Sequence, residues 1–129
     1  MLDRAPNRKI KVLIVDDEPV IADTLLMIFG HEGYEARQAY SAEKALESVK
    51  EWTPHLAVID VVLPRMNGID LAVLLGAVCP GCKIMLFSGQ STAGDLLVAA
   101  RAQGHAFEIM AKPVHPTTLL AIAARLVVE

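Results

Sequence analysis

Side chains that could do chemistry follow four short apolar runs of this sequence. Asp16 and Asp17 follow one run, Asp60 follows another, and Ser88 and Lys112 each follow a further one. Three carboxylates, a hydroxyl and an ammonium in one place would suit phosphoryl transfer, with an aspartate as the nucleophile. A divalent cation such as Mg²⁺ would relieve the repulsion among the carboxylates, because it prefers oxygen ligands and keeps bound water.

The elements that would position these groups can be predicted from hydrophobic patterning. Apolar runs predict five strands, over residues 11–15, 35–39, 56–59, 84–87 and 107–111. The first, third and fourth runs are continuous, which is typical of strands buried on both faces of a parallel sheet. The second run alternates, which favours an edge strand.

Helical patterns fill the gaps between these runs. Pro19 suits a first helical position, and Pro116 opens a last helix that continues through residue 128. Ser41, Asn67 and Thr92 are candidate N-caps of the three helices between them. The alternation of strands and helices predicts a doubly wound α/β fold with a five-stranded parallel sheet.

Strand topology predicts that the reactive groups meet. All strands of a parallel sheet end at the same edge, and open α/β sheets bind ligands outside that edge. Asp16 and Lys112 are therefore expected in one pocket although 96 positions separate them. A loop aspartate, a capping serine or a surface lysine is unremarkable alone, but four strand ends bearing such groups favour a functional site.

Composition and charge indicate how many domains the chain forms and which kinds of partner it binds. The chain has 129 residues, of which 53% are hydrophobic, so we expect one domain over residues 10–129 after a tail over residues 1–9. The net charge of −3 argues against direct nucleic-acid binding, although four cations lie within the first eleven residues. The pattern offers neither a membrane-spanning run nor a signal peptide, which predicts a cytoplasmic protein without a membrane partner.

The two cysteines, Cys79 and Cys82, form a C-x-x-C motif. A redox motif of this kind needs its first cysteine at a helix N-terminus, where the helix dipole lowers the pKa of the thiol. Here the motif follows an apolar helical run, so it lies where a helix ends. With no second cysteine pair, the motif could supply at most half of the ligands of a structural zinc site, and we interpret it as an ordinary loop.

Four segments together resemble the receiver domain of two-component response regulators, of the chemotaxis-regulator type. They are Val12–Pro19, Asp60–Gly68, Phe87–Gly89 and Lys112–Pro113, and the resemblance covers about residues 9–128. It implies a flavodoxin-like sheet in the order 2-1-3-4-5 with helices on both faces. It also implies a phosphoacceptor in a two-component phosphorelay, not an enzyme beyond self-phosphorylation and slow self-dephosphorylation.

The resemblance assigns a role to each site residue. It implies that Asp60 is the phosphoacceptor, that Asp17 binds Mg²⁺ directly, and that Asp16 acts on the metal mainly through water. The backbone carbonyl of Val62 would complete the metal shell. Lys112 would pair first with Asp60 and then with a phosphoryl oxygen.

Partners follow from the same resemblance. Ser88 resembles the switch hydroxyl that follows the phosphoryl group, and a histidine kinase or phosphotransfer protein would supply that group. The responding face in the family comprises the fourth helix, the fifth strand and the fifth helix. Here residues 96–102 and 119–128 are apolar apart from one arginine each, which favours an output partner or self-association through that face.

The sequence departs from the family pattern at a few positions. Ile109 replaces the usual aromatic residue three positions before the lysine, and Phe107 is the nearest substitute. Val62 and Gln90 occupy the positions that, in the family, border the water that hydrolyses the phosphoryl group, and neither carries a carboxylate. We therefore expect a phosphoryl lifetime of minutes or longer.

Two other functions remain open. An unphosphorylated docking module with this fold would suit the missing aromatic residue, but not the intact set of reactive groups. A Mg²⁺-dependent phosphatase of the haloacid-dehalogenase type would need an Asp-x-Asp after the first strand, whereas Asp16 and Asp17 are adjacent. The sequence is compatible with a complete regulator and with a receiver from a longer protein.

Overall fold

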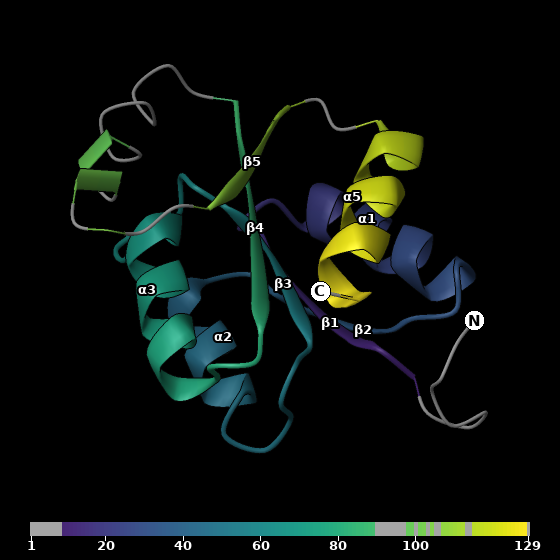
Figure 1. Cartoon of the computed structure of the whole chain (residues 1–129), viewed down its shortest axis with the longest axis horizontal. Helices are drawn as coiled ribbons and strands as arrows, with labels where there is room; N and C mark the ends of the chain where they lie inside the picture. Colours follow the sequence, from purple (N-terminus) through teal and green to yellow (C-terminus); the bar gives the residue numbers. More distant parts are fainter. Residues whose placement is uncertain are drawn as a thin grey trace.

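Five parallel strands form one sheet in the order β2-β1-β3-β4-β5, as expected (Figure 1). The computed structural model describes residues 9–89, 98–99, 101–102, 104, 107–112 and 115–128. The strands are β1 (Lys11–Val15), β2 (Glu35–Ala39), β3 (Leu56–Asp60), β4 (Lys83–Ser88) and β5 (Glu108–Ala111). The alternating strand β2 is at an edge of the sheet, which confirms that prediction.

Helices cover both faces of the sheet. Figure 1 shows α2 and α3 on one side and α1 and α5 on the other. Their bounds are α1 (Pro19–His31), α2 (Ala42–Ser48), α3 (Gly68–Val78) and α5 (Pro116–Val128). Of the expected helix over 96–102, residues 98–99 and 101–102 are helical. Thr92, Gln90, Pro113 and the tail up to residue 8 lie outside the described residues.

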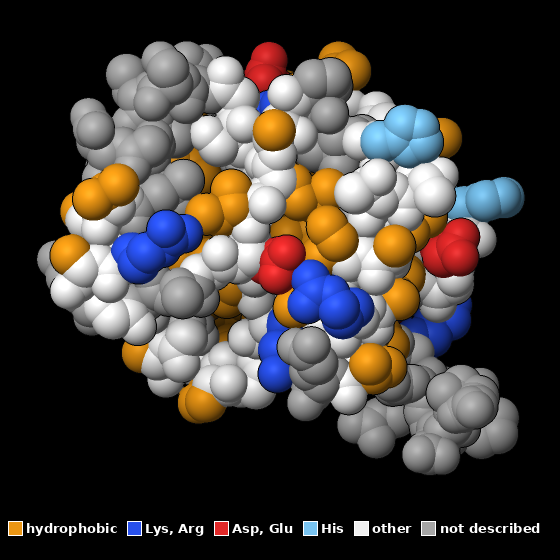
Figure 2. Space-filling view, turned by 45° about the horizontal axis from the view of Figure 1, so that its top comes forward, with side chains coloured by type: hydrophobic (Ala, Val, Ile, Leu, Met, Phe, Trp, Pro, Cys, Tyr) orange, Lys and Arg blue, Asp and Glu red, His pale blue; other side chains and the backbone are white. Residues whose placement is uncertain are grey.

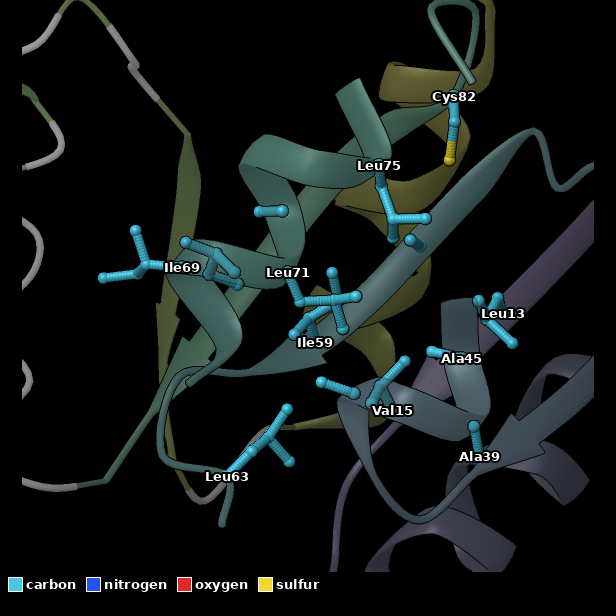
Figure 3. Close-up of a cluster of buried hydrophobic side chains, with 14 of the residues drawn as sticks. Leu13, Val15, Ala39, Ala45, Ile59, Leu63, Ile69, Leu71, Leu75 and Cys82 are labelled. Carbon is cyan, nitrogen blue, oxygen red and sulfur yellow. The ribbon is translucent and has the colours of Figure 1, made fainter. Parts of the chain in front are cut away.

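Alternate residues of the central strands supply two hydrophobic cores. Leu13 and Val15 of β1 pack with α2 and α3, while Val12 and Ile14 pack with α1 and α5. Figure 3 shows the first of these cores, where side chains from the sheet and α3 point toward one another. Because both faces of β1 are buried, its sequence is a continuous apolar run.

Local sequence signals start the helices where predicted. Pro19 opens α1, and the Ser41 hydroxyl accepts a hydrogen bond of 3.1 Å from the Lys44 N–H at the start of α2. The Asn67 side chain accepts two backbone N–H bonds, each 2.9 Å long, in the first turn of α3. These bonds satisfy N–H groups that have no partner within the helix.

The segment between β3 and α3 folds back closely on the end of β3. The Gly68 N–H donates to the Val61 carbonyl over 2.8 Å, and Arg65 has a φ of 64°. A Cβ atom at Gly68 would lie 2.0 Å from the Asp60 carbonyl oxygen. Glycine is therefore required at this position, since any side chain would push α3 away from Asp60.

The cysteine motif closes a turn between α3 and β4. Cys79 is the C-cap of α3, and the Cys82 N–H donates to the Cys79 carbonyl over 2.9 Å. Both thiols are free and buried, and burial raises the pKa of Cys82 to about 12. The expected position at a helix C-terminus is confirmed, and these thiols pack in the core. Within the described part of the chain, no helix has the length and hydrophobicity to cross a membrane.

Candidate functional site

The ends of four strands bring the predicted site residues to one edge of the sheet. Asp60 and Ser88 are the last residues of β3 and β4, whereas Asp16 and Lys112 come directly after β1 and β5. Lys112 therefore reaches across the end of β4 to contact Asp60 and Asp16. Convergence of residues that lie up to 96 positions apart follows from the parallel topology.

The Asp60 carboxylate is almost completely buried, with 4% of the residue exposed. Its Oδ1 atom accepts the Val62 N–H over 3.1 Å, and its Oδ2 atom lies 2.9 Å from the Lys112 Nζ atom. Both oxygens thus have a partner, as a buried carboxylate requires. These contacts fix the orientation of the carboxylate toward the neighbouring cavity.

Asp16 is fully buried beside Asp60. Its Oδ1 atom accepts the Glu18 N–H over 2.8 Å, and its Oδ2 atom lies 3.3 Å from the Lys112 Nζ atom. Burial raises the pKa of the Asp16 carboxyl above its ordinary value, and the charge of Asp60 adds to the rise. The hydrogen bond from Glu18 and the ammonium of Lys112 act in the opposite direction.

Lys112 is the cation of the site. Besides Asp60 and Asp16, its Nζ atom lies 3.9 Å from a carboxylate oxygen of Glu18. Burial lowers the pKa of Lys112, but the hydrogen bond and charge of Asp60, followed by those of Asp16, raise it above the ordinary value. The ammonium therefore remains charged at neutral pH.

The carboxylates of Asp16, Asp17 and Asp60 form an acidic cluster. Each offers one oxygen atom, and these three oxygens lie within 4.8 Å of one another. Asp17 is exposed, whereas Asp16 and Asp60 are buried. Clustered carboxylate oxygens with access to solvent fit a hard divalent cation that keeps part of its water shell.

A cavity of about 390 Å³ opens beside this cluster. It is lined by Asp17, Glu18, Asp60, Val62, Gly89 and Lys112. Val62 is 40% exposed and brings an apolar side chain to the cavity, as its sequence position suggested. Ser88 is half-buried, and its carbonyl accepts the Lys112 backbone N–H over 3.1 Å.

Sequence reasoning missed two residues that contact Lys112. Glu18 lines the cavity and contributes a further carboxylate, and its position directly after Asp17 could have indicated this. The Phe87 ring centroid lies 5.0 Å from the Lys112 Nζ atom. Phe87 looked like a core residue because its side chain completes an apolar strand.

Ile109, which replaces the usual aromatic residue, lies in β5 and packs against the same core as Phe107. Phe107 precedes the first residue of β5 and is half-buried. The two side chains therefore lie on the same side of the sheet.

The geometry can be compared with known proteins. The family model for the response regulator receiver domain matches residues 12–124. The chain is 32% identical over 117 residues to the DNA-binding response regulator MtrA of Mycolicibacterium smegmatis. The aligned region covers 90% of this chain and 50% of MtrA. It is 32% identical over 101 residues to the probable transcriptional regulatory protein TcrX of Mycobacterium tuberculosis, covering 78% of this chain and 43% of TcrX.

Solved structures of response regulators also resemble this chain. A CheY-like response regulator receiver domain protein from Methanospirillum hungatei superposes with a TM-score of 0.81 and 32% identity, over 92% of this chain and 94% of that one. NtrX from Brucella abortus superposes with a TM-score of 0.81 and 29% identity, over 93% of this chain and 27% of that one. The chain spans about half the length of the curated relatives it matches.

Proposed function

This chain belongs to the response regulator receiver domain family, a regulatory domain of two-component signalling, and we propose that Asp60 is its phosphoacceptor. The observation that carries the proposal is the contact of 2.9 Å between Asp60 and Lys112 beside an open cavity. It joins a nucleophile to the cation that would stabilise the transferred group.

The proposed reaction moves one phosphoryl group. An Asp60 carboxylate oxygen attacks phosphorus and forms a new P–O bond, while the bond from phosphorus to the donor breaks and the leaving group takes the electron pair. Lys112 turns from Asp60 to a phosphoryl oxygen and balances the charge there. The domain thus catalyses its own phosphorylation and, slowly, its own dephosphorylation.

The acidic cluster is the proposed magnesium site. Asp17 and Asp60 would bind Mg²⁺ directly together with the Val62 backbone carbonyl, and Asp16 would act mainly through water. The closeness of the three carboxylate oxygens and the exposure of Asp17 support this assignment. Bound Mg²⁺ would neutralise negative charge on the phosphoryl oxygens during transfer.

The donor is proposed to be a histidine kinase or a phosphotransfer protein. An apolar cavity of about 480 Å³ lies between α1 and the start of α5, and shares Gly89 and Lys112 with the polar cavity. On the outer face of α1, Val20 is 78% exposed and Met27 is 72% exposed. An apolar surface next to the reactive cavity would allow a protein donor to dock with its phosphoryl group above Asp60.

The output is proposed to involve Ser88 and the face formed by β5, α5 and the expected fourth helix. The exposed residues of this face include Val98 and Val128, which are 67% and 70% exposed. Figure 2 shows hydrophobic side chains exposed on one side of the molecule, together with several charged ones. Phosphorylation adds about −1.5 to −2 charges, which would rearrange Ser88 and change binding of an output partner or a second copy.

Direct DNA contact by this segment is not part of the proposal. The relatives described as DNA-binding are about twice as long as the matched region. The net charge of −3 favours a protein partner over a nucleic acid. The cytoplasmic location remains a prediction.

Phosphorylation by a small donor tests the assignment of Asp60. We expect acetyl phosphate with Mg²⁺ to add the mass of one phosphoryl group to the wild type and none to Asp60→Asn. Asp70→Asn is the matched control, because Asp70 is exposed on α3 and does not line the cavity. Unchanged labelling of Asp60→Asn would overturn the assignment.

A further inference from the structure

Lys112 contacts three consecutive residues, the last two of β4 and the glycine that follows them. Its backbone N–H donates to the Ser88 carbonyl over 3.1 Å. Its aliphatic stem passes Gly89 so closely that a Cβ atom there would lie 3.3 Å from the Lys112 Cβ and Cδ atoms. Its ammonium lies over the ring of Phe87, 5.0 Å from the ring centroid. Backbone, stem and charge are therefore each positioned by a different residue.

The ring of Phe87 is a rigid part of this arrangement. Phe87 is 2% exposed and packs in the core between the sheet and α1 and α5. Phe87 also lines the apolar cavity, together with Lys112. A side chain packed at the density of a protein interior has little freedom to move. The ring thus offers a fixed negative face to a cation that must itself move.

The attraction between an ammonium and an aromatic face differs from a hydrogen bond in one respect. It depends on the position of the charge over the ring and not on the direction of an N–H bond. Lys112 now directs its donors at Asp60 and Asp16, at 2.9 and 3.3 Å. Lys112 must redirect one N–H donor to a phosphoryl oxygen when Asp60 is phosphorylated. Contact with the ring can persist during that change.

We infer that Phe87 is a positioning residue for Lys112, which keeps the ammonium in the site while its hydrogen-bond partners change. This inference rests on the proposed phosphorylation of Asp60. An interaction raises a rate only if it is stronger in the transition state than before it. In the resting site the ammonium is paired with the carboxylates of Asp60, Asp16 and Glu18, so the ring matters most once the Asp60 carboxylate is engaged with phosphorus.

Fluorinated phenylalanines at position 87 provide the test. Successive fluorine atoms remove negative charge from the ring face while largely keeping its shape. We expect the maximal rate of phosphorylation by acetyl phosphate to fall stepwise, by about two- to five-fold across the series. The donor concentration at half-maximal rate should stay constant, because Phe87 does not line the polar cavity beside Asp60. Phe87→Tyr should keep most of the rate.

The same analogues at Phe29 are the matched control. Phe29 is fully buried in the same core and pairs with Tyr34, with ring centroids 5.4 Å apart. Fluorination there should leave the phosphorylation rate unchanged. A rate that responds equally at both positions would show a packing effect and overturn the inference.

A second measurement follows the ring directly. The ε-methylene protons of Lys112 should show a ring-current shift in the NMR spectrum of the wild type, and we expect Phe87→Leu to remove it. The shift should persist after phosphorylation. Its loss in the phosphorylated wild type, or a flat fluorine series, would overturn the role of Phe87 while labelling of Asp60 stayed intact. Labelling of Asp60→Asn would instead overturn the proposed function itself.

Discussion

The Lys112 ammonium lies 2.9 Å from the Asp60 carboxylate although 52 positions and strand β4 separate the two residues. This contact forms only if β3, β4 and β5 are all in register, since Lys112 must reach over the end of the middle strand. The pair therefore reports on the correct assembly of the whole edge of the sheet. The predictions that follow concern the surroundings of this pair.

Two glycines of α3 should respond in opposite ways to the same substitution. Gly68→Ala should destabilise the fold by about 1–3 kcal/mol, because the added Cβ would lie 2.0 Å from the Asp60 carbonyl oxygen. Gly76→Ala has no atom within 4 Å of its added Cβ and should stabilise α3 by about 0.5–1 kcal/mol. Urea denaturation measures both. Equal effects of the two changes would contradict the close approach of α3 to Asp60.

Magnesium should stabilise the folded protein through the acidic cluster. At a concentration ten times its Kd, Mg²⁺ should raise the free energy of unfolding by about 1.4 kcal/mol. Asp17→Asn should lose most of this gain, and in metal-free buffer it should be more stable than the wild type because charge repulsion is reduced. Thermal unfolding with and without millimolar Mg²⁺ measures both effects. No shift in the wild type, combined with an unchanged or lower stability of Asp17→Asn, would exclude a metal site here.

The phosphorylated form should be long-lived. Val62 has no group that could align a water for attack on phosphorus, and Gln90 carries an amide that cannot act as a base. We expect a lifetime of minutes or longer after the donor is removed, and faster decay in a Val62→Asn, Gln90→Glu variant. Val62→Leu is the control that keeps an apolar side chain. Decay of the wild type within seconds, or no acceleration in the double variant, would refute this prediction.

Acidification should affect the metal-free wild type and Asp16→Asn differently. Burial raises the folded-state pKa of Asp16 above its ordinary value of 3.8, so protonation of this carboxyl favours folding. This stabilising contribution is complete below 3.8 and is lost as the pH rises through the raised folded pKa. The wild type should therefore gain stability relative to Asp16→Asn as the pH falls from 7 to about 3.8. Denaturation curves at both pH values, without Mg²⁺, measure the difference; a relative loss would contradict it.

Most of the fold could be predicted because burial leaves a strong pattern in the sequence. The runs over 11–15 and 35–39 match β1 and β2, and the other three strands differ from their predicted ranges by one residue at one or both ends. Continuous apolar runs identify central strands, since only burial on both faces removes the alternation. The ends of β4 were less clear because Lys83 and Ser88 are polar yet pair in the sheet.

The site could be predicted as a location but not as a network of contacts. Topology placed Asp16, Asp60 and Lys112 at one edge, because strand ends depend only on the order of elements. The contacts of Lys112 with Glu18 and Phe87 depend on how a long, flexible side chain crosses β4. Such a path is set by packing in three dimensions, for which the linear sequence contains no periodic signal.

Lys112 follows the three carboxylates of the acidic cluster in the sequence, and this order has a consequence during protein synthesis. A ribosome releases the three carboxylates of the acidic cluster well before it releases this lysine, since chains emerge from their N-terminus. A nascent or truncated chain therefore carries the acidic groups without the cation that balances them. The proposed site is complete only when translation has supplied β5 and the lysine that follows it.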